Sequence, residues 1–201
     1  LRLREPVSIK PGDRFVIRFY SPLETIGGGL ILDDAPVRHK RGDSAVLAAL
    51  RIRESGSDAE RILQQLAAFG CALPGAEQLA QPLGMDAALL LPQLGQLAAA
   101  GRILEPLPGR YLSSAVFDGL WETCRALLAA YHARNPLHTG MRDAELRQKL
   151  FRSSAQSVCD AILAALCREG RIRISAGRCA LADFSVRYTR RQAAIREELL
   201  A

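Results

Sequence analysis

Two hydrophobic patterns divide the chain near Gly42. Before it, apolar runs at residues 15–19 and 25–32 flank a short turn that contains proline. Apolar runs joined in this way are typical of a β-hairpin. After it, the sequence is rich in Ala and Leu, and apolar residues recur at helical spacing, as in residues 62–69. The pattern predicts a β-region followed by a mainly helical part.

The β-region has two unusual features. Gly27, Gly28 and Gly29 lie inside the second apolar run, where glycine usually marks a bulge or a close approach by another backbone. Residues 1–14 are expected to form a strand and a turn at residues 11–13. Because an isolated hairpin is at best marginally stable, we expect this β-region to lack an N-terminal part or to be completed in another way.

Capping and breaking residues divide the helical part. We expect helices at residues 43–54, 57–69, 75–83 and 86–100, with Pro92 kinking or splitting the last one. Two short β-runs follow, at residues 102–105 and 110–113. Helices followed by a β-hairpin are the plan of a winged-helix domain.

The plan repeats farther along the chain. Leu97-x-x-x-Gly101-Arg102-Ile103 and then Gly109-Arg110 are echoed by Leu166-x-x-x-Gly170-Arg171-Ile172 and then Gly177-Arg178, at offsets of 69 and 68 residues. A fixed period indicates tandem copies of one small domain. The second copy is expected to have helices at residues 116–134, 143–150 and 154–169 and wing strands at residues 171–175 and 178–182. A charged amphipathic stretch, residues 188–201, is interpreted as the start of a third copy.

The passages SPLETIGGG, residues 21–29, and NPLHTGMRDAELR, residues 135–147, resemble the bacterial selenocysteine-specific elongation factors, the SelB type. FVIR, SPLETIGGG and the D-x-x-P-x-R-H-K-R tail, within residues 15–41, are similar to the last β-barrel domain of translational GTPases. The passage NPLHTGMRDAELR, residues 135–147, resembles part of a C-terminal winged-helix repeat in that family. The resemblance covers most of the chain.

The resemblance implies a mixed fold: the end of an all-β elongation-factor barrel domain followed by tandem, mainly α winged-helix domains. The expected domains are the C-terminal part of barrel domain III at residues 1–42, winged-helix repeats at 43–113 and 114–182, and the start of a further repeat or a tail at 183–201.

The resemblance also implies a function. In this family the whole protein is a GTPase that delivers selenocysteinyl-tRNA to UGA codons marked by an mRNA hairpin. This segment would contribute tRNA-side barrel contacts and a winged-helix spacer toward the hairpin-binding end, with the ribosome as a further partner. The chain contains no G-x-x-x-x-G-K-[ST] phosphate loop. We therefore expect no enzymatic activity and no cofactor here, and GTP and Mg in an N-terminal domain that these residues do not include.

The distribution of charge favours two parts of the chain as RNA-binding surfaces. Residues 1–42 have a net charge of +3 and residues 114–182 of +4, whereas residues 43–113 have −2 and are a poor nucleic-acid surface. The tRNA-side candidates are Thr25, Gly27, Gly28, Gly29, Arg38, His39, Lys40 and Arg41. A second set could contact RNA backbone: Arg142, Arg147, Lys149, Arg152, Arg171, Arg173 and Arg178. For each of these residues, a purely structural or solvated role remains the alternative.

Two other functions stay open. A DNA-binding winged-helix regulator is disfavoured because the expected recognition helix of the first repeat, residues 86–100, has no Lys or Arg to contact base edges. In a protein–protein scaffold, the apolar face at residues 89–97 would meet a partner.

The remaining chemistry is sparse. The five cysteines include no C-x-x-C pair, so neither a metal site nor a disulfide framework is expected. No apolar run reaches the roughly 18 residues of a membrane span. We expect a cytoplasmic monomer.

Overall fold

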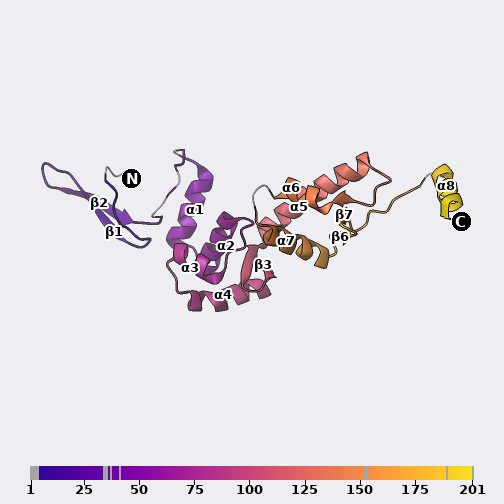
Figure 1. Cartoon of the computed structure of the whole chain (residues 1–201). Coiled ribbons are helices and arrows are strands. Elements are labelled where there is room, and N and C mark those ends of the chain that lie inside the picture. Colours follow the sequence, from indigo (N-terminus) through magenta and orange to yellow (C-terminus); the bar gives the residue numbers. More distant parts are fainter. Residues whose placement is uncertain are drawn as a thin grey trace. The chain divides into compact units, whose positions relative to one another are not determined.

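The computed structural model covers residues 1–201 and describes all of them except residues 1–4, 34, 35, 37, 41, 152, 153, 189 and 201. The chain divides into two compact units. The first comprises Leu1–Ala68 and Pro74–Ile103, and the second comprises Phe69–Leu73 and Leu104–Ala201. Figure 1 follows the elements along the chain.

The first unit begins with the predicted β-hairpin. Strands β1 (Arg14–Arg18) and β2 (Thr25–Leu30) are antiparallel, and their register shifts between Ile17 and Arg18. This shift is the predicted irregularity, because the pairing skips Ile26 of β2, the residue just before Gly27. The expected earlier strand is wrong for residues 5–13, which form a turn and irregular chain. Ile31 instead exchanges backbone hydrogen bonds with Gly12 and Asp13.

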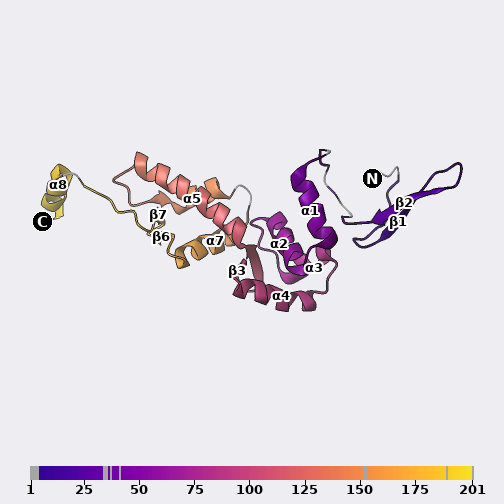
Figure 2. The same ribbon diagram turned by 180° about the vertical axis from the view of Figure 1, so that it is seen from behind.

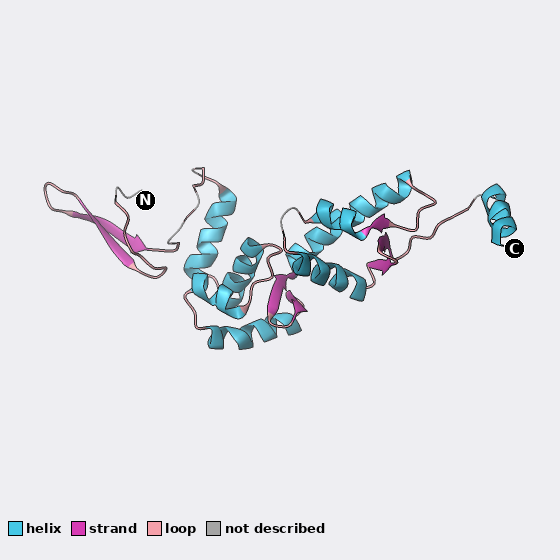
Figure 3. Ribbon diagram, in the orientation of Figure 1, coloured by secondary structure: helices cyan, strands magenta, loops and turns pink. Residues whose placement is uncertain are grey.

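Four helices complete the first unit, close to their predicted bounds: α1 (Ser44–Ser55), α2 (Asp58–Phe69), α3 (Ala76–Leu83) and α4 (Ala87–Ala99). Asp43 caps α1 by accepting hydrogen bonds from the N–H groups of Ala45 and Val46. Figure 3 shows how fully helices dominate this part of the chain. The buried side chains of the last three helices include Ile62, Leu66, Leu79, Leu90 and Leu94.

Helix α4 runs without a break through Pro92, so the expected split is wrong. Because Pro92 has no N–H, the helix lacks one backbone hydrogen bond, the one to the carbonyl of Ala88 in the first helical turn. Leu90, Leu94 and Leu97 are buried along one stripe of the helix. Burial of such a stripe stabilises the helix on both sides of the proline.

The second unit contains most of the small β-structure. Strands β3 (Ile103–Leu107) and β4 (Arg110–Ser113) form a two-stranded sheet, and β3 begins at the boundary between the units. A three-stranded sheet follows, with the order β5-β7-β6. The remaining elements are α5 (Ser114–Arg134), β5 (Met141–Arg142), α6 (Asp143–Leu150), α7 (Gln156–Arg168), β6 (Ile172–Ser175), β7 (Arg178–Leu181) and α8 (Arg190–Leu200).

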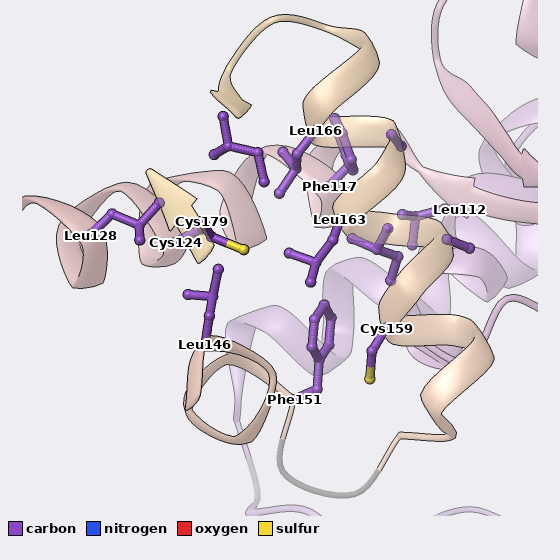
Figure 4. Close-up of a cluster of buried hydrophobic side chains, with 14 of the residues drawn as sticks. Leu112, Phe117, Cys124, Leu128, Leu146, Phe151, Cys159, Leu163, Leu166 and Cys179 are labelled. Carbon is purple, nitrogen blue, oxygen red and sulfur yellow. The ribbon is translucent and has the colours of Figure 1, made fainter. Parts of the chain in front are cut away.

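One hydrophobic core holds the second unit together. Leu128 and Cys124 of α5, Leu146 of α6, Leu163 of α7 and Cys179 of β7 all contribute to it. Figure 4 shows these side chains converging from the helices and from β7. Figure 2 shows the same part of the chain from behind, with α5 and α7 next to β6 and β7. The core therefore positions the sheet, and with it the residues that the sheet displays.

The predicted repeat has a counterpart in backbone geometry. Gly101 after α4 and Gly170 after α7 both have φ of 67°, in the left-handed region. Arg102 donates its backbone N–H to Leu97 at 2.9 Å, and Arg171 donates to Leu166 at 3.0 Å. These bonds define the same Schellman-type helix end, which turns the chain into a strand. The predicted domain boundaries themselves stay predictions.

Candidate nucleic-acid interface

The first candidate set lies on the exposed strand β2 and on the chain after it. An added Cβ on Gly28 would meet the Phe15 carbonyl oxygen at 2.6 Å, and one on Gly29 would meet the Phe15 ring at 2.6 Å. Nothing lies within 4 Å of such an atom on Gly27. Packing within the hairpin therefore explains two of the three glycines. Contact of RNA with Thr25 and with the glycines stays a prediction.

The basic cluster follows β2 as irregular chain. Arg38, His39 and Lys40 are exposed, and Arg41 lies outside the described residues. Just before the cluster, Asp33 forms an ion pair with Arg53 of α1. Phosphate binding by these cations stays a prediction.

Three cations of the second set are held by acidic side chains of the protein itself. Arg147 forms ion pairs with Asp143 at 3.0 Å and with Asp160 at 2.9 Å, which ties α6 to α7. Lys149 contacts Glu145 at 2.7 Å, one turn away on α6. These carboxylates offset the charge that an RNA phosphate would meet.

Arg171 is also engaged within the fold. Its guanidinium contacts Asp118 at 3.0 Å and Glu169 at 2.7 Å. It also lies over the rings of Phe117 and Trp121, at 5.2 and 5.6 Å from their centroids. Arg171 therefore fastens the start of the wing to α5.

Arg142, Arg173 and Arg178 have a different setting, because none of them forms an ion pair with a described residue. Arg178 donates from Nη1 to the Gly140 carbonyl at 3.0 Å, and Arg173 donates to the Phe184 carbonyl. Arg142 and Arg173 are exposed, and Arg178 is partly buried. The last candidate, Arg152, lies outside the described residues.

Sequence reasoning missed strand β5, which brings Arg142 beside the wing. Met141 pairs with Cys179, and Arg142 pairs with Arg178. A Cβ on Gly140 would lie 2.5 Å from the Cys179 carbonyl oxygen, so only glycine allows the two strands to approach in this way. Two residues are too few to show strand alternation. Gly140 was the only signal that the sequence offered.

The buried titratable groups of the second unit are structural. His132 accepts a hydrogen bond at Nε2 from the Leu181 N–H at 3.4 Å and stacks on Phe184 at a centroid distance of 3.5 Å. Burial lowers the pKa of His132; the nearby Arg173 lowers it further, and Asp183 opposes them. Burial also raises the pKa of Cys124 to about 12 and of Cys179 to about 11, which leaves both thiols protonated.

No group of three or more His, Cys, Asp or Glu side chains in the described part of the chain is placed to hold a metal ion. None of the helices described is both long and apolar enough to cross a lipid bilayer.

Comparisons with known proteins identify relatives of the chain. Residues 125–181 match the family model described as elongation factor SelB, winged helix. The chain is 28% identical over 180 residues to the selenocysteine-specific elongation factor of Desulfomicrobium baculatum, a match that covers 88% of this chain and 28% of that protein. The chain thus spans little more than a quarter of that relative.

A solved structure is also similar. It is the mRNA-binding domain of elongation factor SelB from E. coli in complex with SECIS RNA, with 21% identity and a TM-score of 0.48. The similarity covers 64% of this chain and all of that one. The chain resembles the C-terminal portion of SelB-type selenocysteine-specific elongation factors, as the motifs predicted.

Proposed function

We propose that this chain works as part of an elongation factor that delivers selenocysteinyl-tRNA to UGA codons marked by an mRNA hairpin. The observation that carries the proposal is the family match over residues 125–181. In the structure, this range runs from the middle of α5 through α6 and α7 to the end of β7. It therefore lies within the second unit and contains most of the elements that form its core.

The N-terminal hairpin is proposed to complete an elongation-factor barrel. Tyr20 is 98% exposed, and Val16, Phe19, Leu23 and Ile26 are also exposed apolar side chains. Hydrophobic burial favours covering such a surface, and a two-stranded sheet is marginally stable by itself. Further barrel strands of the whole protein would cover it. Thr25, the glycines and the basic cluster at residues 38–41 would then face the tRNA.

The two winged-helix regions are proposed to have different roles. Helix α4 contains no charged residue. It therefore offers nothing to neutralise phosphate, which suits a spacer. The cations of the second region suit contact with RNA backbone. The mRNA hairpin would be held mainly by parts of the whole protein outside this chain.

The whole protein is proposed to bind GTP and Mg outside this segment, which has no phosphate loop of its own. It would work as a cytoplasmic monomer on the ribosome. This division leaves the present chain to position RNA.

The test is binding of the chain to selenocysteine tRNA, an ordinary elongator tRNA, the selenoprotein mRNA hairpin and a DNA duplex, each at two salt concentrations. We expect salt-sensitive binding that prefers selenocysteine tRNA, and weaker binding to the mRNA hairpin. The double variant Arg38→Ala/Lys40→Ala should weaken tRNA binding. Arg125→Ala, which removes a cation already paired with Glu122, is the matched control. Preference for the DNA duplex would refute the proposal in favour of a DNA-binding regulator.

A protein-docking role for α4 is the second candidate. Leu89 is 66% exposed and Leu91 is also exposed on this uncharged helix. If α4 docks against a ribosomal protein, Leu89→Arg should weaken ribosome association and leave tRNA binding unchanged. Equal ribosome association of the variant and the wild-type chain would exclude this role.

A further inference from the structure

We propose that the outer face of the β5-β7-β6 sheet is a phosphate-binding surface that holds RNA backbone without reading its sequence. The assignment rests on the proposed function for its choice of RNA as the partner. It goes beyond that function by naming a site and the residues that form it. The outer face is defined by Arg142, Arg173, Ser175, Arg178 and Ala180, with Thr139 at its edge.

Strand register places these side chains on one face. Arg142 and Ser175 both pair with Arg178 on β7, and Arg173 pairs with Ala180. Paired residues of antiparallel strands project to the same side, and residues two apart on one strand do so as well. Cys179, between Arg178 and Ala180, projects the other way into the core. The three arginines therefore share the side of the sheet that faces away from the core.

None of the three arginines on this face forms an ion pair with a described residue. Residues 135–142 and 170–182, which carry the three strands, contain no Asp or Glu. Arg142 lies directly opposite Arg178, and like charges in that position destabilise a sheet. The contacts of Arg173 and Arg178 with backbone carbonyls orient the two guanidinium groups but leave their charge in place. A bound anion would relieve the repulsion.

The outer face is also hollowed. A cavity of about 390 Å³ is lined by Thr139, Arg173, Ser175, Ala176, Arg178 and Ala180. Two guanidinium groups and two hydroxyl groups thus surround one concave space, and all four can donate hydrogen bonds. Arginine suits phosphate because its planar fork can bind two oxygens at once. Hydroxyl and arginine contacts with phosphate fix the position of a nucleic acid but carry no base specificity.

The β3–β4 sheet provides an internal contrast. At the repeat offsets of 69 and 68 residues, Leu104 corresponds to Arg173, Pro106 to Ser175 and Arg110 to Arg178. Leu104 packs, partly buried, against the core of the second unit. Arg110 contacts the Leu73 carbonyl at 3.5 Å. The earlier wing thus keeps a cation at the Arg178 position but has apolar residues where the later wing has Arg173 and Ser175, so the pair of arginines is not a general feature of this repeat.

The experiment measures the salt dependence of RNA binding by the 201-residue chain, using fluorescence anisotropy and a labelled RNA hairpin unrelated to selenoprotein mRNA. The test variant is Arg142→Gln/Arg173→Gln/Arg178→Gln. Each lost phosphate contact should lower the slope of log K against log salt by about 1, so the triple variant should lose about 2 to 3. The corresponding triple Lys variant keeps the charge and should keep most of the slope. Arg125→Gln, which removes one cation from α5, should leave the slope nearly unchanged.

A triple Gln variant with a wild-type circular dichroism spectrum and a wild-type slope would overturn the assignment. If that variant does not fold, the single variant Arg142→Glu is measured in its place. It should fold, because the Arg142 side chain is exposed and lies outside the core. Its slope should fall by about 1, and an unchanged slope would overturn the assignment. Polyglutamate serves as a second probe. Binding of polyglutamate but not of RNA would also overturn the assignment, in favour of an acidic protein partner.

The experiments distinguish a failure of the phosphate-binding site from a failure of the proposed function. Wild-type binding that prefers selenocysteine tRNA, combined with an unchanged slope in the triple variant, would refute only the site. Backbone binding that depends on the three arginines, with a preference for duplex DNA over all RNAs, would refute the translation-factor proposal and keep the anion site.

Discussion

Leu166→Ala should strongly destabilise the second unit. Leu166 is 0% exposed and lies near the end of α7, just before the Schellman-type turn into the wing. Figure 4 shows it among the side chains of the hydrophobic core. The substitution removes three carbon atoms, worth about 2.4 kcal/mol at roughly 0.8 kcal/mol for each buried CH₂ group. The cavity that remains should raise the loss to about 3–5 kcal/mol.

The assay is urea unfolding followed by tryptophan fluorescence. Trp121 is the single tryptophan of the chain, lies on α5 and packs against the core of the second unit. Its signal therefore reports this unit. The matched control is Leu137→Ala, at a leucine that is 45% exposed, which should cost less than about 1 kcal/mol.

Two results would refute the reasoning. A loss below about 1 kcal/mol for Leu166→Ala would mean that the site is not a packed core. Equal losses for Leu166→Ala and Leu137→Ala would mean that burial does not distinguish the two positions. A change in the dependence of the unfolding free energy on urea would instead indicate altered compactness of one state.

Three further predictions concern other elements. Gly140→Ala should force β5 away from Cys179 and lower the free energy of unfolding by about 1–3 kcal/mol, measured by Trp121 fluorescence. It should also weaken RNA binding on the outer face, measured by the slope of log K against log salt. Hydrogen bonds from Ser57, at the start of α2, lower the pKa of Glu60 from 4.5. The ionised carboxylate should therefore stabilise the fold above pH 4.5, and this stabilisation should be lost as the pH falls through the lowered pKa. Glu60→Gln should flatten this part of the pH dependence of thermal unfolding. Burial lowers the pKa of His132 from 6.5, so the second unit should lose stability as the pH falls below about 6.5, and His132→Gln should remove that loss. For Glu60→Gln and for His132→Gln, a pH profile equal to that of the wild-type chain would contradict the role given to the replaced side chain.

The cations show how far residue type can mislead. Arg147, Lys149 and Arg171 have the same charge as Arg142, Arg173 and Arg178. Carboxylates four residues before Arg147 and Lys149 on one predicted helix offered a local reason to set these two apart, but nothing local set Arg171 apart. Arg171 binds Asp118, which lies 53 residues earlier in the chain. Only the fold brings that carboxylate near, and its charge then offsets the attraction of Arg171 for phosphate.

Local signals determined most of the elements. Asp43 and Asp86 cap the helices that they were expected to begin, and Gly84 and Gly101 follow the helices that they were expected to end. These signals are reliable because caps and positive-φ turns depend on neighbouring residues alone. A split at Pro92 was wrong because the burial that stabilises its helix comes from other segments, whereas a kink there stays a prediction.

The sequence by itself determined the helices, both wings, the hairpin and the resemblance to SelB-type factors, because periodicity, caps and short motifs are local. The tertiary structure decided three things. It added β5 to the later wing, explained Gly28 and Gly29 by the nearness of Phe15, and divided the cations into paired and unpaired sets. The β5 pairing and the ion pairs of Arg147 with Asp160 and of Arg171 with Asp118 join residues that are well separated in the chain, and such contacts arise only when the core brings the segments together.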